Sequence, residues 1–264
     1  MEETASRFDD LYTRGLQTVT IPHRELIDEL RDEMVSCVCE EFKLESDEPT
    51  RFLNEIHQII DIDQDLNPIR LRVMDFLNSG ERYKRLIYQA CKPIIDEIIG
   101  PDVAVQKRIN LVVQTPRNED EILPVHSDVE GGDSPFEVTI WLPLVDVFGS
   151  KSMFIFDRSY GVSIIDALEK TGESDLIKLR DRWLRPDHYV DLRYGSALLF
   201  NPLLLHGHAV NSTDETRWAI NWRVKSIFSP YGPKDFGDYF EVINMSPQTK
   251  LGMEYYGQRF RSKR

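Results

Sequence analysis

Apolar residues in the first hundred positions repeat at intervals of three and four. This spacing places apolar side chains on one face of an α-helix. The segments that show it are 22–42, 52–60, 69–77 and 81–99. A short, weakly alternating stretch at residues 16–21 is instead typical of an edge strand. We therefore predict a mostly helical layer over residues 1–101.

The pattern changes after Gly100, where short runs of alternating or β-branched residues are separated by turn signals. The strands that it predicts lie within 103–113, at 136–144, 152–156, 189–192 and 197–200, and from Arg217 onward. Such a series is typical of a β-sandwich or barrel. One stretch, 164–183, has helical spacing with a break at Gly172, and we expect it to cap one mouth of the barrel.

These patterns predict a mainly β fold with α-helices, arranged as one domain over residues 1–264. Its helical layer, 1–101, packs on a small antiparallel barrel, 102–230, and a C-terminal extension follows at 231–264. With 41% hydrophobic residues, the chain can bury a real core.

The net charge of −13 disfavours nucleic acids and anionic membranes as partners, because both require a positive surface. No run approaches about 18 apolar residues, so no membrane span is expected. The first ten residues are acidic and lack an apolar core, so no signal peptide is expected. The three cysteines are odd in number and lack zinc spacing, which indicates buried thiols in a cytoplasmic protein.

Candidate chemistry is concentrated between residues 195 and 225, which read GSALLFNPLLLHGHAVNSTDETRWAINWRVK. An apolar strand leads through a break to His206, Gly207 and His208, and Arg217 opens the next strand after a polar turn. We predict an antiparallel hairpin across which His206 faces Arg217. A neutral metal ligand would then lie near a cation that can bind a carboxylate.

A second motif, His126-Ser127-Asp128, supplies further metal-binding groups. Residues two apart in an extended segment point to the same face, so His126 and Asp128 can reach one ion. With a distant histidine they would form the set of two histidines and one carboxylate that non-haem iron(II) oxygenases use. The spacing leaves open whether that histidine is His206 or His208, because Gly207 allows a tight turn between them.

This combination of motifs resembles the phytanoyl-CoA hydroxylase-like branch of the iron(II)/2-oxoglutarate-dependent oxygenases. It is most similar to the oxygenases found sporadically in carbohydrate-biosynthesis clusters. The resemblance rests on HSD at residues 126–128, the run HSDVEGGDSPFEVTIWLPLVDVFGSKSM with Trp141 on its strand, and LLFNPLLLHGH and TRWAINWR between residues 198 and 223. It covers roughly residues 110–229.

The resemblance implies a double-stranded β-helix, the jelly-roll or cupin-like barrel. It implies that His126, Asp128 and His206 bind iron(II) and that Arg217 holds the distal carboxylate of 2-oxoglutarate. The remaining cosubstrate pocket would be lined by Trp141, His208, Gln114 and Thr139, and Asn110 is the alternative to Gln114 on the strand before the HSD motif.

With O2, such a site would hydroxylate an unactivated C–H bond of a small molecule, for which a sugar is a candidate. The alternative is a non-catalytic barrel of the same fold that binds a metal or another ligand. Arg223 and Lys225 share strand parity with Arg217, so each could form a salt bridge or bind substrate. The sequence indicates neither the substrate nor the oligomeric state.

Overall fold

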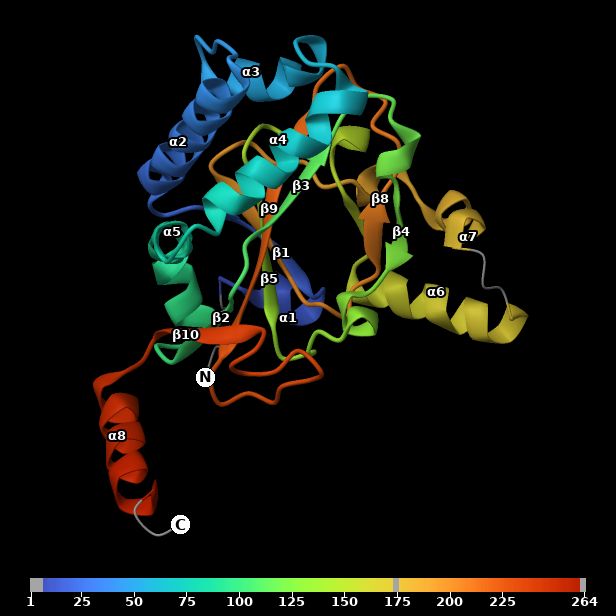
Figure 1. Ribbon diagram of the computed structural model, residues 1–264. Coiled ribbons are helices and arrows are strands. Elements are labelled where there is room, and N and C mark those ends of the chain that lie inside the picture. The colour runs from blue at the N-terminus through green and yellow to red at the C-terminus, as the bar shows by residue number, and fades with distance from the viewer. Residues whose placement is uncertain (1–6, 173–175, 262–264) are drawn as a thin grey trace.

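The computed structural model describes residues 7–172 and 176–261 and contains two antiparallel sheets that face each other, with helices outside them (Figure 1). The larger sheet has the order β1 (Leu16–Thr20), β7 (Ser196–Phe200), β5 (Val138–Pro143), β9 (Arg217–Ser226), β2 (Val103–Gln106) and β10 (Phe240–Asn244), and β3 (Asn110–Gln114) also pairs with β9. The smaller sheet has the order β4 (Leu123–His126), β8 (His206–His208) and β6 (Phe154–Ile155).

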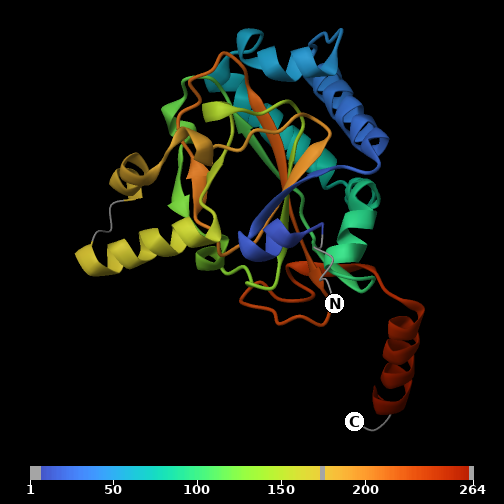
Figure 2. The same ribbon diagram turned by 180° about the vertical axis from the view of Figure 1, so that it is seen from behind.

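Helices cover the outer face of the larger sheet (Figures 1 and 2). They are α2 (Arg24–Phe42), α3 (Pro49–Glu55), α4 (Ile62–Leu77) and α5 (Arg82–Ile98), and a short α1 (Asp9–Thr13) precedes them. Local signals define their ends. Lys43 stops α2 in the left-handed conformation, whereas the Glu48 carboxylate accepts hydrogen bonds from the first backbone N–H groups of α3. The predicted helical layer is thus confirmed.

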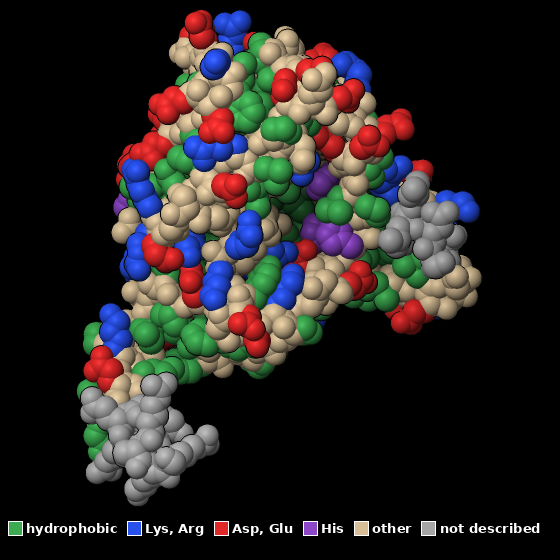
Figure 3. Space-filling model, viewed as in Figure 1, with side chains coloured by type: hydrophobic (Ala, Val, Ile, Leu, Met, Phe, Trp, Pro, Cys, Tyr) green, Lys and Arg blue, Asp and Glu red, His purple; other side chains and the backbone are tan. Residues whose placement is uncertain are grey.

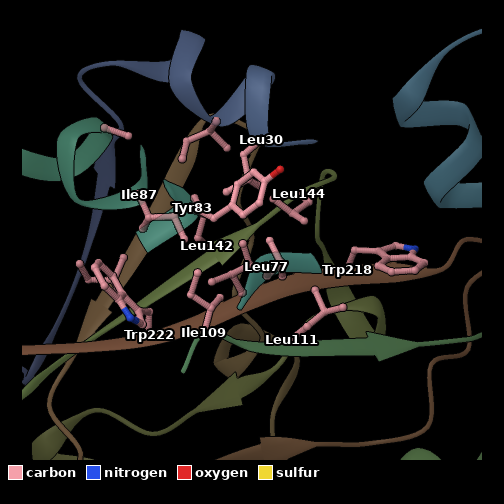
Figure 4. Packing of buried hydrophobic residues seen from close by; sticks show 14 of the residues in the cluster. Leu30, Leu77, Tyr83, Ile87, Ile109, Leu111, Leu142, Leu144, Trp218 and Trp222 are labelled. Carbon is pink, nitrogen blue, oxygen red and sulfur yellow. The ribbon is translucent and has the colours of Figure 1, made fainter. Parts of the chain in front are cut away.

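The main core lies between these helices and the larger sheet. Figure 4 shows Trp218 and Trp222 of β9 in one cluster with Leu30, Leu77 and Ile87, which come from α2, α4 and α5. Each indole N–H is also paired, one with the carbonyl of residue 53 and the other with that of residue 106. Burial of these large apolar surfaces fixes which face of β9 points to the helices.

The opposite face of β9 points toward the smaller sheet and is largely polar. Successive side chains of a strand alternate between its two faces. The helix side therefore receives Trp218, Ile220, Trp222 and Val224, and the inner side receives Arg217, Ala219, Asn221, Arg223 and Lys225. All but Asn221 of this inner row are buried, so three cations lie in the interior of the protein.

Two further helices, α6 (Arg158–Thr171) and α7 (Leu176–Trp183), lie beside the smaller sheet (Figure 1). Ile164 of α6 packs with Val125, Phe154 and Phe156 on the outer face of that sheet. Gly172 ends α6 with a φ of 66°. The helical prediction for this stretch is confirmed on either side of residues 173–175, which lie outside the described residues. Its contacts place α6 on the outside of the smaller sheet, and no described contact shows it across a barrel mouth.

Several sequence predictions differ from the structure. Helical residues outnumber strand residues, so the fold is mixed α/β and the expectation of a mainly β chain is wrong. Residues 189–192 make only isolated bridges, to Phe154 and Val147. The strand β10 and the helix α8 (Pro247–Arg261), which projects from the body in Figures 1 and 2, were not predicted. The division into one domain with three segments stays a prediction.

The predicted hairpin between the His206 strand and the Arg217 strand is also wrong. β8 pairs with β4 and β6, whereas β9 pairs with β5, β3 and β2, so the two strands belong to different sheets. Among the described residues no strand pair links the sheets, and neither sheet closes on itself. No helix in the described ranges is long and apolar enough to span a lipid bilayer.

Candidate metal centre

Three predicted ligands meet at the inner face of the smaller sheet. His126 ends β4 and His206 begins β8, and the two residues lie opposite each other in the strand register. Asp128 begins the short helix that follows β4. One nitrogen of each imidazole and one carboxylate oxygen lie within 4.8 Å of one another, and this is the only such cluster found among the described residues. Both Nε2 atoms are 3.7 Å from Oδ1 of Asp128.

Backbone carbonyl groups determine which imidazole nitrogen is free to bind a metal. Nδ1 of His126 is 2.9 Å from the carbonyl oxygen of Pro124, and Nδ1 of His206 is 2.9 Å from that of Leu204. A carbonyl oxygen only accepts hydrogen bonds, so each Nδ1 carries the hydrogen. The lone pair of each Nε2 is therefore directed at the cluster, as a metal ligand requires.

Burial also favours the neutral imidazole of His206, because it lowers the pKa of this ring to about 4. The ring is thus neutral at neutral pH and can donate its lone pair.

Gly207 permits the close approach of β8 to β4. A Cβ atom at this position would lie 2.6 Å from the carbonyl oxygen of Leu123 in β4. The glycine of the HGH sequence therefore lets β8 pack tightly on β4.

Arg217 lies on the facing sheet, at the start of the inner row of β9. Its side chain is almost fully buried, and its Nε and Nη1 atoms have no hydrogen-bond partner. Burial lowers the pKa of its guanidinium to about 9, which reflects the cost of a buried charge, and the negative charge of Glu121 offsets only part of this shift. The next strand places Gln114 directly opposite, with its Oε1 also unpaired. The unpaired N–H groups of Arg217 fit an anionic ligand, because an anion would accept their hydrogen bonds and offset the cost of burying the positive charge.

The other predicted pocket residues lie on neighbouring strands. Thr139 and Trp141 are on β5, opposite Arg223 and Asn221 respectively, and both are buried. His208 is not part of the metal-capable cluster. Its Nδ1 lies 3.3 Å from the Glu121 carbonyl oxygen, and burial together with the nearby Arg217 lowers the pKa of its ring. Figure 3 shows a hollow in this face of the molecule that histidine side chains border.

A charged network around Asp128 was not found from the sequence. Nη2 of Arg223 is 2.7 Å from Oδ2 of Asp128, and Lys225 pairs with Glu137 at 3.7 Å. Burial raises the pKa of Glu137 to about 7. Strand parity predicted that both cations could point inward. Asp133 belongs to the irregular segment after the HSD motif, where periodicity gives no signal, and Glu137 lies within the predicted strand 136–144, whose alternation does not reveal its partner.

Comparisons with known proteins support the fold and not a close relationship. No protein-family model matches the sequence, and no curated protein sequence matches it. The structure is similar to a non-haem monooxygenase, ThoJ, in complex with nickel, with a TM-score of 0.55 and 15% identity over 97% of this chain and 96% of that one. It is also similar to EvdMO1, with a TM-score of 0.55 and 13% identity over 84% of this chain and 49% of that one.

HygX from Streptomyces hygroscopicus, with nickel and 2-oxoglutarate bound, gives a TM-score of 0.50 at 15% identity over 86% of this chain and 89% of that one. The resemblance inferred from the sequence is therefore confirmed at the level of the fold. The arrangement of helices and antiparallel sheets that holds the His126–Asp128–His206 cluster is the one found in non-haem monooxygenase structures.

Proposed function

We propose that the protein is an iron(II)- and 2-oxoglutarate-dependent dioxygenase that hydroxylates an unactivated C–H bond of a small molecule. One arrangement carries this proposal. Two imidazole Nε2 atoms and one Asp128 oxygen converge on the smaller sheet, and a buried Arg217 with unpaired donors lies on the sheet that faces it. A metal site and an anion site thus share one interior.

His126, His206 and Asp128 would hold the iron, since neutral imidazoles and a carboxylate suit it and three ligands leave coordination positions open. Iron(II), 2-oxoglutarate and O2 together supply the oxidising chemistry that replaces a C–H bond with C–OH. Arg217 would bind the distal carboxylate of 2-oxoglutarate, because its planar fork matches a carboxylate. The burial of this arginine keeps water away from the pair and so strengthens it.

The remaining pocket residues fit supporting roles toward the cosubstrate. The hydroxyl of Thr139 is buried without a partner and can donate to a carboxylate, whereas the unpaired amide oxygen of Gln114 only accepts, so Gln114 would line the pocket without donating through that atom. Trp141 and neutral His208 would complete the walls. The nickel and 2-oxoglutarate bound to HygX support a metal with this cosubstrate in the same fold. We also propose that the two sheets form the two halves of a double-stranded β-helix.

For the substrate, we propose a sugar or another carbohydrate-biosynthesis intermediate, on the strength of the sequence resemblance. A net charge of −13 supports a small molecule over nucleic acid or an anionic membrane. A cytoplasmic location remains an expectation. The rival, a non-catalytic barrel that retains a metal or another ligand, predicts no turnover of 2-oxoglutarate.

The test is succinate formation from 2-oxoglutarate by protein reconstituted with iron(II) in air. His126→Ala, Asp128→Ala and His206→Ala should each abolish it while leaving the fold intact. His23→Ala, at an exposed histidine, is the matched control and should retain it. A ligand variant with normal turnover would remove that residue from the assignment. Mass spectrometry of nucleotide sugars incubated with the active protein would then seek a product that has gained one oxygen atom.

A further inference from the structure

The guanidinium of Arg223 bridges two buried carboxylates next to the metal centre. Its Nη2 is 2.7 Å from Oδ2 of Asp128, and its Nε is 3.2 Å from Oδ2 of Asp133. Its Nη1 donates to the side-chain oxygen of Gln106 at 3.2 Å. The three charged side chains are at most 9% exposed. One hydrogen bond and two close ion pairs therefore hold the guanidinium in a dry environment, although Nε of Arg223 and Oδ2 of Asp128 do not reach hydrogen-bond geometry in these pairs.

This contact gives the two oxygens of Asp128 different tasks. Oδ1 faces the Nε2 atoms of His126 and His206, whereas Oδ2 is taken by Arg223. A carboxylate that can rotate offers a metal either one oxygen or both. Because the ion pair with Arg223 holds Oδ2, Asp128 offers the cluster a single oxygen in a fixed direction.

Arg223 also neutralises the buried carboxylate of Asp133. Its carboxylate is almost fully buried and close to Asp128, to which its backbone N–H is also hydrogen-bonded. A second carboxylate so near could compete for the metal or repel Asp128. Asp133 is instead paired with two cations, because Lys234 contacts the same oxygen at 2.7 Å. The two acids and two bases balance in charge. Of the two acids, only Asp128 has an oxygen within the metal-capable cluster.

We propose that Arg223 is a positioning residue that orients Asp128 for metal binding through one oxygen and holds Asp133 away from the metal. The proposal rests on the proposed function only in requiring that His126, Asp128 and His206 bind the metal. It separates Arg223 from Arg217, for which no ion pair is found among the described residues. The two arginines of the inner row thus serve the metal ligand and the cosubstrate respectively.

Lys225 provides a matched control. It lies on the same face of β9, two residues further along, and its side chain is fully buried. Its partners are Glu137 and the carbonyl oxygen of Pro230, and it contacts no predicted metal ligand. Lys225→Gln therefore removes a buried cation from the same strand without freeing Asp128.

The experiment measures binding of cobalt(II) to the full chain by calorimetry and by the visible absorption bands of the bound ion. Arg223→Gln should weaken binding about 10- to 100-fold, the usual effect of losing a group that orients a ligand. Its cobalt bands should also change, because Asp128 can then offer both oxygens. Arg223→Lys should recover only part of the affinity, since an ammonium group lacks the planar fork that bridges two carboxylates. Lys225→Gln should match the wild type in both measurements.

Equal affinity and equal bands in wild type and Arg223→Gln would overturn the proposal. So would an equal loss in Lys225→Gln, because it would show an effect of buried charge alone. Should Arg223→Gln fail to fold, Asp133→Asn keeps the arginine but removes its second anchor. That variant should bind cobalt more weakly than the wild type, and unchanged binding would again overturn the proposal. Wild type that binds cobalt but makes no succinate with iron would contradict the proposed function and leave this inference standing.

Discussion

At the scale of single residues, the spacing of the HSD motif was sufficient to predict that the side chains of His126 and Asp128 lie close together. The spacing alone left the choice between His206 and His208 open, because residues two apart on β8 point to the same face, and only the resemblance favoured His206. The register supports His206, since it lies opposite His126 whereas His208 lies opposite Leu123. That register depends on a contact between strands far apart in the chain, which no local pattern reports.

Arg217 gives a quantitative prediction at the same scale. Its guanidinium is buried with two unpaired nitrogen atoms, so Arg217→Ala should weaken 2-oxoglutarate binding without removing the metal. Removing one partner of a buried ion pair costs about 2–5 kcal/mol, which corresponds to roughly 30- to 4000-fold in affinity. Arg217→Lys keeps the charge but loses the fork, so its affinity should lie between those of wild type and Arg217→Ala. The measurement is an anaerobic titration of 2-oxoglutarate into the iron(II) protein, followed by absorbance.

The matching control for that titration is iron binding itself, which should be the same in both Arg217 variants because Arg217 is not a ligand. If Arg217→Ala bound 2-oxoglutarate as tightly as the wild type, the distal carboxylate would have to be held elsewhere. The remaining unpaired donors of the inner face would then be the candidates, because a carboxylate only accepts hydrogen bonds.

At the scale of elements, the hairpin prediction failed for a reason that the loop explains. Consecutive strands usually pair, so a polar turn between two apolar runs indicates a hairpin. Residues 209–216 instead carry the chain from the smaller sheet to the larger one. Lys151 fixes this loop by donating hydrogen bonds to Glu215 and to Asn54 of α3. His206 and Arg217 therefore share one interior across two sheets, although the predicted pairing is absent.

The packing of α6 against the smaller sheet can be tested by mutation. Ile164 is fully buried among Val125, Phe154 and Phe156, so Ile164→Ala should lower the free energy of unfolding by about 2–5 kcal/mol. Ile165, the next residue, is 44% exposed, and Ile165→Ala should change it by less than about 0.5 kcal/mol. Urea denaturation of both variants measures the difference. Equal effects would show that α6 is not anchored on this sheet.

At the scale of the whole molecule, the sequence predicted the helical layer correctly but did not establish whether the strands close into one barrel. Helical periodicity is a local property, so the apolar spacing within α2, α4 and α5 was enough to predict the helical layer. Whether two sheets join into a barrel depends on pairing between strands that are distant in sequence, and the described strands form two separate sheets. β10, an edge strand of five residues, was not predicted, although β7 has the same length and was.

This separation of the sheets has a consequence for stability. The proposed metal ligands belong to the smaller sheet and the segment after β4, whereas Arg217 belongs to the larger sheet. A metal ion with 2-oxoglutarate would therefore connect the two sheets, and 2-oxoglutarate should stabilise the fold much more with nickel(II) present than without it. A ligand at 100 times its Kd adds about 2.7 kcal/mol to the free energy of unfolding. At about 2–4 °C per kcal/mol for a chain near this size, Tm should rise by roughly 5–10 °C.

Variants separate the part of this rise in Tm that depends on the metal from the part that depends on the contact of 2-oxoglutarate with Arg217. Arg217→Ala should keep the shift caused by nickel(II) and lose the further shift caused by 2-oxoglutarate, because only the link to the larger sheet is gone. Asp128→Ala should lose both shifts, since the metal itself binds poorly. Succinate, which has two carboxylates but no 2-oxo group to chelate the metal, should give a smaller rise than 2-oxoglutarate in the wild type. If 2-oxoglutarate raised Tm equally with and without nickel(II), it would bind away from the metal, and the two sheets would not be connected through it.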